Sequence, residues 1–208
     1  MFKTQSLFFT YNNSVDFSFP DIELDAGENL LILGESGIGK TTLLHLIAGL
    51  LRPVSGSVEL LGTSIHQLSS TQLDSFRGQH IGLVFQRPHF IHSLSLYENL
   101  ALVQYLAGEN PNQNRINNVL ASLGIRRKQG EKPHRLSQGE QQRAAIALAM
   151  VNNPQLILAD KPTSSLDDRN CMKVAILLKE QALETGARLI IITHDQRLKN
   201  HFSHTMQL

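Results

Sequence analysis

The sequence predicts an α/β fold with a mainly parallel sheet, and two features of its apolar pattern carry that prediction. Short apolar runs of strand length alternate with longer segments whose apolar residues recur every three to four positions. Near-continuous apolar strands are typical of parallel sheets that are covered by helices on both faces. The clearest runs are Asn29–Leu33, Ile81–Phe85, Leu156–Ala159 and Leu189–Thr193. We therefore expect a single domain over 1–208, built around these strands.

The chain before residue 29 is patterned differently from these apolar runs. Phe17, Phe19, Ile22 and Leu24 are separated by polar residues. This alternation is typical of strands with one buried face. We predict an N-terminal antiparallel β part here, and a further short strand over 57–62.

The middle of the chain is helical in character. Apolar residues at helical spacing run over 94–106 and 115–123, and the polar stretch 126–134 marks a loop. We interpret 88–150 as an α-helical subdomain inserted into the α/β core. Another helix is expected over 169–184, before the last apolar run.

Composition limits the function classes. Lysine and arginine number 19 and aspartate and glutamate 18, a net charge of +1, and the basic residues are scattered, so we expect no nucleic-acid partner. No apolar run approaches the roughly 18 residues that span a bilayer, and the first residues do not resemble a signal peptide. The one cysteine, Cys171, fits a reducing compartment and is interpreted as a packing residue of a helix. These features predict a cytoplasmic protein.

The most informative segment is Gly34–Thr41, which has the spacing Gly-x-x-x-x-Gly-Lys-Thr between a predicted strand and a predicted helix. Glycines let successive backbone N–H groups turn toward an anion, and the helix amino end adds a favourable dipole. We expect Lys40 to reach the β- and γ-phosphates of a nucleoside triphosphate, and the Thr41 hydroxyl to hold Mg²⁺. The alternative, a turn that only caps a helix, is disfavoured because the Lys-Thr pair is in register. The residues expected to surround the nucleotide are Gly34, Glu35, Ser36, Gly37, Ile38, Gly39, Lys40, Thr41 and Thr42.

Polar residues follow the other predicted strands. Open α/β sheets bind ligands at the carboxyl ends of their strands, where this chain has Gly34, Gln86, Asp160 and His194. A carboxylate beside a phosphate-binding loop can hold Mg²⁺ directly or through water, which is the role expected of Asp160. The competing interpretation of Asp160 is a helix cap at a strand end.

A second motif lies at Leu136–Glu140. Ser137 and Glu140 have the spacing of a capping box, so a helix should begin here. That is a sufficient structural explanation, yet Ser-x-Gly at a helix amino end, with Gly139, also predicts a second anion site.

Together these motifs make the chain, from Phe9 to His204, resemble the ATP-binding cassette (ABC) ATPase family. Gly34–Thr41 is similar to Walker A, Leu136–Glu140 to the signature, Leu156–Asp160 to Walker B and Ser165–Asp167 to the D-loop. The adenine-stacking A-loop aromatic, the Q-loop glutamine and the switch histidine have counterparts in Tyr11, Gln86 and His194. Tyr11 can also be explained as an ordinary strand residue.

The resemblance implies a P-loop NTPase core that binds ATP and Mg²⁺, with Gln86 joining Thr41 and Asp160 at the metal. It also implies a head-to-tail pair of cassettes, identical or different. Ser137 and Gly139 would then contact the γ-phosphate bound to the partner, and Glu140 and Asp167 are counted with the nucleotide-binding residues. Further partners would be transmembrane permease subunits, which place the chain peripherally on the inner face of the cell membrane. Their docking groove is expected to use Phe90, Ile91, Leu94, Leu96 and Tyr97. Each of these residues taken singly is explained at least as well as part of the core of the helical insert. The wording of the motifs is most like the branch of lipoprotein-release and macrolide-export systems.

One residue departs from the family pattern. The position after the Walker B aspartate normally carries a glutamate that polarises the attacking water, and here it is Lys161. A lysine is protonated at neutral pH and cannot accept a proton. We expect MgATP to bind at this site and to be hydrolysed slowly.

Three other functions were weighed against an active transporter ATPase. An ATP-gated module that dimerises with little hydrolysis is favoured by Lys161, whereas Gln86, Asp167 and His194 favour the active enzyme. A soluble ABC ATPase of DNA repair or translation usually has coiled-coil inserts or two cassettes, for which 208 residues leave no room. A small-molecule P-loop kinase would leave the Ser137 motif without a purpose beyond capping.

Overall fold

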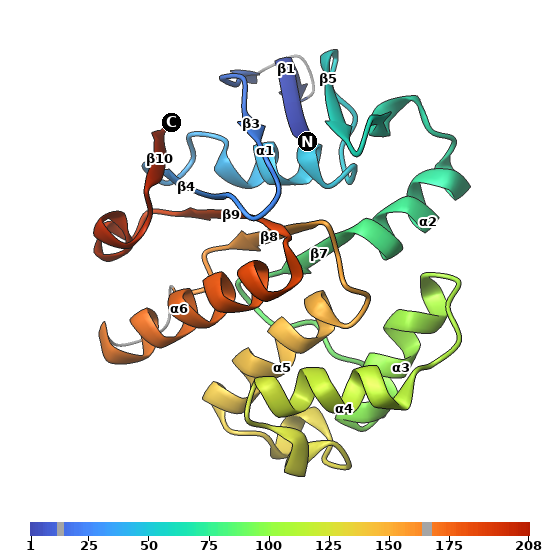
Figure 1. Ribbon diagram of the computed structural model, residues 1–208. Coiled ribbons are helices and arrows are strands. Elements are labelled where there is room, and N and C mark those ends of the chain that lie inside the picture. The colour runs from blue at the N-terminus through green and yellow to red at the C-terminus, as the bar shows by residue number, and fades with distance from the viewer. Residues whose placement is uncertain (12–14, 164–167) are drawn as a thin grey trace.

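The computed structural model in Figure 1 describes residues 1–11, 15–163 and 168–208. Within these residues an antiparallel sheet near the amino terminus and a parallel sheet lie on opposite sides of helix α1 (Lys40–Ile47). The fold is α/β with a mainly parallel core sheet, an antiparallel N-terminal part and a group of inserted helices, which confirms the predicted fold class.

The antiparallel sheet follows the order β2–β1–β5–β6, and β3 pairs with the start of β1, on the same edge as β2. Its strands are β1 (Phe2–Tyr11), β2 (Val15–Ser18), β3 (Glu23–Leu24), β5 (Ser55–Leu60) and β6 (Thr63–Ser64). Phe19, Ile22 and Leu24 are buried and Phe17 is half-buried, as their alternation with polar residues predicts.

The core sheet is parallel throughout and follows the order β10–β4–β9–β8–β7. Its strands are β4 (Asn29–Leu33), β7 (Ile81–Val84), β8 (Leu156–Asp160), β9 (Arg188–Thr193) and β10 (His204–Gln207). The first four correspond to the four apolar runs. The edge strand β10 was not predicted, because its largely exposed residues lack an apolar run.

Side chains of the parallel strands alternate between two cores, as the period of two in a strand requires. Leu30 and Ile32 pack with α1 and the antiparallel sheet, whereas Leu31 and Leu33 face the core formed with the later helices. Both faces are therefore apolar, and the strands read as continuous apolar runs.

Along the described part of the chain, one of the remaining helices precedes β7, three lie between β7 and β8, and one follows β8 (Figure 1). They are α2 (Ser70–His80), α3 (Leu96–Leu106), α4 (Gln113–Ser122), α5 (Gln138–Met150) and α6 (Asp168–Thr185). Four short 3₁₀ turns are η1 (Ile65–Gln67), η2 (Arg126–Lys128), η3 (Pro133–Arg135) and η4 (Gln196–His201). Helices α3, α4 and α5 contact one another, and the boundary of a subdomain at 88–150 stays a prediction.

Helix α2 was missed in the sequence. Leu73 is its one buried residue, so it lacks an apolar stripe. Its signal was the capping box of Ser69 and Gln72, in which the side chain of each accepts a hydrogen bond from the main-chain N–H of the other.

Candidate functional site

The glycine loop joins β4 to α1 at the carboxyl edge of the parallel sheet. Gly37 (φ 89°) and Gly39 (φ 103°) adopt left-handed backbone conformations that side chains disfavour. A Cβ atom on Gly39 would lie 2.5 Å from Cδ1 of Phe17. The local fold of the loop therefore needs glycine at Gly39 on two counts, conformation and space.

Lys40 begins α1 and lies over the loop, 3% exposed. Its Nζ donates hydrogen bonds to the carbonyl oxygens of Gly34 (2.8 Å) and Glu35 (2.6 Å). Burial lowers the pKa of Lys40 below its ordinary value, the charge of Lys161 lowers it further, and Asp160 opposes the shift. The ammonium is thus held in place by neutral carbonyl groups.

The amino end of α1 has no capping side chain and no acidic residue in its first turn. The first N–H groups of a helix have no partner within it, and they carry the positive end of its dipole. This end is built to receive an anion.

Thr41 and Asp160 meet although 119 residues separate them. The Thr41 hydroxyl donates to Oδ2 of Asp160 at 3.1 Å. The other oxygen, Oδ1, is buried without a hydrogen-bond partner among the described residues. Within the described chain no three acidic, histidine or cysteine residues cluster as a complete metal site. One carboxylate with one hydroxyl fits Mg²⁺, which commonly takes its other ligands from water and phosphate.

The other predicted strand-end residues lie at the same edge of the sheet. Gln86 follows β7 and His194 follows β9, and both are exposed. Because β4, β7, β8 and β9 are parallel, Gly34 and Asp160 share this edge with them. The predicted juxtaposition of the four strand ends is therefore observed, while their roles remain predictions.

Tyr11 lies beside the glycine loop at the end of β1, 41% exposed. Its hydroxyl is 3.3 Å from Oγ1 of Thr42. Its ring meets Phe9 and Phe17 edge-on, at centroid distances of 4.7 and 6.0 Å. An aromatic ring therefore lies beside the glycine loop, and its stacking on adenine stays a prediction. Sequence reasoning missed Phe17 as a neighbour of the loop.

A hollow of about 140 Å³ lies at the glycine loop. Its lining residues are Phe17, Gly37, Gly39, Lys40, Thr41, Thr42 and Lys161. Larger hollows, of about 290 to 430 Å³, lie elsewhere and contain none of these residues. We regard the small hollow as the candidate site, because the loop, Lys40 and Thr41 converge there.

Lys161 follows Asp160 with a left-handed backbone (φ 45°), which is uncommon for a residue other than glycine. Its main-chain N–H donates to the carbonyl of Ile192 at 2.8 Å, which extends the pairing of β8 with β9. The side chain is half-buried. The structure therefore places this lysine inside the candidate site.

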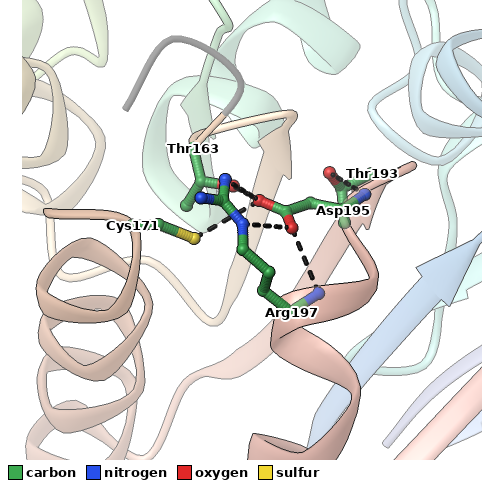
Figure 2. A network of polar contacts seen from close by, with 5 residues as sticks. All are labelled: Thr163, Cys171, Thr193, Asp195 and Arg197. Atoms are coloured by element: carbon green, nitrogen blue, oxygen red, sulfur yellow. Dashed lines mark hydrogen bonds and ion pairs between the residues drawn. The ribbon is translucent and has the colours of Figure 1, made fainter. Parts of the chain in front are cut away.

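A polar network next to His194 was not predicted. In Figure 2, Thr163, Cys171 and Arg197 converge on the carboxylate of Asp195. Thr163 Oγ1 (3.1 Å), Cys171 Sγ (3.3 Å) and the Arg197 guanidinium (2.7 Å) all donate to Oδ2. The Arg197 guanidinium, opposed by burial, holds the pKa of Asp195 well below its ordinary range. The network ties the segment after β8 to α6 and η4, so Cys171 is more than a packing residue.

The signature motif begins α5, as predicted. Ser137 caps the helix, and its hydroxyl accepts from the N–H of Glu140, 3.4 Å away. Oε2 of Glu140 accepts from the Ser137 N–H (2.8 Å) and hydroxyl (2.9 Å). Gly139 is exposed. None of the described residues that line the hollow at the glycine loop comes from α5.

Two further predictions have different outcomes. Leu96 was expected to line a docking groove, but it is fully buried at the start of α3 and packs in the core. Asp167, with the rest of the D-loop, lies outside the described residues.

Comparisons with known proteins agree with this geometry. Residues 19–164 match the model of the family described as ABC transporter. The chain is 38% identical over 190 residues to the lipoprotein-releasing system ATP-binding protein LolD of Chromohalobacter salexigens, covering 90% of this chain and 80% of that protein. It is 37% identical over 180 residues to LolD of Shewanella frigidimarina, covering 86% and 75%.

Solved structures give the same answer for the fold. A dimeric ATP-binding cassette in a post-hydrolysis state, bound to ADP and Pi, superimposes with a TM-score of 0.87 at 31% identity, over 100% of this chain and 94% of that one. cbiO1 from Clostridium perfringens, part of the ABC transporter complex cbiONQ, gives a TM-score of 0.88 at 28% identity, over 99% and 83%.

Proposed function

This chain belongs to the ABC transporter family, and we propose that it is the ATP-binding subunit of a transporter whose membrane-spanning parts are separate chains. The observation that carries the proposal is the convergence of Lys40, Thr41 and Asp160 on the glycine loop. Its similarity to lipoprotein-releasing ATP-binding proteins and to a component of cbiONQ supports the role. Among the described residues, no helix is long and apolar enough to cross a membrane. A peripheral position on the inner face of the cell membrane is part of the proposal.

We infer that ATP binds with Tyr11 toward the base and the glycine loop around the phosphates. Thr41 and Asp160 would hold Mg²⁺, with Gln86 as a further oxygen ligand at the same sheet edge. When bound, the metal would neutralise charge that develops on the phosphates. Two observations support this assignment: Oδ1 of Asp160 has no hydrogen-bond partner among the described residues, and the Thr41 hydroxyl donates to Oδ2.

We further propose that two cassettes pair so that Ser137 and Gly139 of one face the nucleotide of the other. The position of the signature on α5, away from the chain's own glycine loop, supports a site completed by a second chain. The similar cassette solved as a dimer with ADP and Pi supports the pairing of two cassettes.

A groove close to Gln86 is proposed to receive the membrane subunit. It has a volume of about 290 Å³ and lies between β7, α2, α3 and α5. Apolar residues on its wall include Phe85, Pro88, Val103 and Leu148. Of the residues expected to line a docking groove, Leu96 is buried, and Phe90, Ile91, Leu94 and Tyr97 stay predictions.

Slow hydrolysis is the finer part of the proposal. Lys161 stands in the hollow where a base would have to accept a proton from water, and its ammonium cannot do so. General-base assistance is worth about 10²–10⁴-fold in rate. The chain would then act chiefly by binding and releasing MgATP, as an ATP-gated dimerising module.

Phosphate release by wild type, Lys161→Glu and Lys199→Glu, with Mg²⁺, tests this part. We expect Lys161→Glu to turn over about 10²–10⁴-fold faster than wild type. Lys199 is exposed on η4, so the matched charge change there should leave turnover unchanged. Equal turnover of wild type and Lys161→Glu would contradict slow hydrolysis and leave an ordinary transporter ATPase.

A mixed pair of cassettes supplies a second test. If the partner carries a glutamate at the position of Lys161, the partner's site would be completed by Ser137 and Gly139 of this chain. Phosphate release should then rise sharply on mixing, and Ser137→Ala should remove the rise. Low turnover in every mixture would contradict this pairing.

A further inference from the structure

The hollow at the glycine loop contains two lysine side chains from distant parts of the chain. Lys40 comes from α1 and Lys161 from the end of β8, and both line the same volume of about 140 Å³. The charge of Lys161 acts on Lys40, whose pKa it lowers. The two ammonium groups are therefore close enough to repel each other before any ligand is present.

The two lysine cations in the hollow outnumber the acidic groups described next to them. Lys40 is held by two neutral carbonyl oxygens, and the nearby acid is Asp160, which accepts the Thr41 hydroxyl. Among the described residues, no hydrogen bond or ion pair engages the Lys161 ammonium. An anionic ligand with several oxygens would supply the missing partners, because charge-assisted hydrogen bonds are the strong ones.

The backbone at Lys161 adds an independent observation. A left-handed conformation is disfavoured in a residue with a Cβ atom. It persists here because the main-chain N–H is fixed on Ile192, at the strand end that carries Asp160. Strained positions of this kind are common at ligand-binding sites, so the strain at Lys161 points to a functional role for this residue.

The two lysines enter the hollow from different elements, so they would meet different parts of a triphosphate. A glycine loop and the helix after it take the α- and β-phosphates. Lys161 does not belong to that loop and follows the end of β8. The terminal phosphate is the part of the ligand left for it.

We propose that Lys161 is a second phosphate-binding cation, which contacts the terminal phosphate and makes the site prefer ATP to ADP. The inference rests on the proposed binding of ATP and goes further, because it gives this lysine a positive role in recognition. ATP loading, more than turnover, would then set the state of the chain.

Equilibrium binding of MgATP and of MgADP to the intact chain, by calorimetry, tests the proposal. The variants are wild type, Lys161→Met, Lys161→Arg and the exposed-site control Lys199→Met. We expect Lys161→Met to weaken ATP binding about 10-fold and ADP binding less than 2-fold. Lys161→Arg should retain most of the preference, and Lys199→Met should bind both nucleotides like wild type.

Two results would overturn the proposal. If Lys161→Met weakens ATP and ADP equally, the lysine contributes only general charge or structure. If it changes neither, its ammonium does not reach the ligand. Thermal unfolding of each variant separates a folding defect from a binding defect, and Lys161→Arg provides the test if Lys161→Met is unstable. Failure of wild type to bind ATP at all would instead contradict the proposed function itself.

Discussion

Helices α1 and α5 both begin beside a glycine, but different groups satisfy their first turns. At α5 the chain closes its own end, because Ser137 and Glu140 exchange hydrogen bonds. At α1 the cap is Gly39, with no side-chain acceptor and no acid in the first turn. Unsatisfied N–H groups at a helix end need another partner. The uncapped amino end of α1 lies beside Lys40 and Lys161, whose positive charges also favour an anion there.

Other helices are also capped at their amino ends by a side chain of the chain itself. Helices α2 and α3 have capping boxes at Ser69 and Ser95, and Asn112 caps α4. Asp195 caps η4 through the N–H of Arg197. Among the α-helices whose amino-terminal caps are described, α1 alone has no side-chain cap. This comparison can be tested from both sides.

The largest effect is expected from Gly39→Ala at the uncapped end. The added Cβ conflicts with the left-handed backbone and with the Phe17 ring 2.5 Å away. We expect MgATP affinity to fall about 100-fold, from strain of a few kcal/mol in the loop. Calorimetric titration measures it, with Gly130→Ala as control because a Cβ there meets open space. Equal affinity in the two variants would show that the loop tolerates a side chain.

The next largest effect, on stability, is expected from Asp195→Asn at the capped amino end of η4. The carboxylate accepts from Thr163, Cys171 and Arg197, and hydrogen bonds to a charged group are worth about 1.5–3 kcal/mol. We expect the free energy of unfolding at pH 7 to fall by about 2 kcal/mol. Exposed Asp74, paired with Arg77 three residues on, is the control, and Asp74→Asn should cost less than about 1 kcal/mol.

The same network gives a pH dependence with a defined sign. The pKa of Asp195 is lowered in the folded chain, so its contribution is complete above the unfolded value of about 4. The contribution is lost as the pH falls from there toward the folded pKa. The difference in stability between wild type and Asp195→Asn, measured by denaturant unfolding, should therefore begin to shrink below about pH 4 and shrink further at lower pH. A difference that stays constant down to pH 3 would contradict the assignment.

Ser137→Ala separates capping from ligand binding. Loss of an N-cap serine costs about 1 kcal/mol of stability. Ser95→Ala removes the same cap from α3, so both variants should lose a similar amount in denaturant unfolding. We expect ATP-dependent dimerisation, followed by sedimentation, to fail in Ser137→Ala alone. Equal dimerisation of the two variants would reduce Ser137 to a cap.

The sequence predicted most of this architecture because local signals and tertiary packing agree. The buried strands β4, β7, β8 and β9 read as apolar runs, and the glycine loop has a fixed spacing. Elements without an apolar face, α2 and β10, gave no such signal. The meeting of Thr41 with Asp160 followed from the parallel order of strands. The Asp195 network did not, because its members come from separate elements that no periodicity links.

Glu140→Gln gives the smallest and most selective change. Hydrogen bonds from the Ser137 N–H and hydroxyl hold the pKa of Glu140 below its ordinary value, so a negative charge stands where the family has a glutamine. Glutamine can also close a capping box, so α5 should keep its cap. Removing the charge from an end proposed to meet phosphate should strengthen ATP-dependent dimerisation about 2- to 5-fold at low salt, less in 0.5 M salt. Glu98→Gln changes the same charge on α3 and should have no effect. An equal response of the two variants would place the α5 amino end outside the partner's nucleotide site.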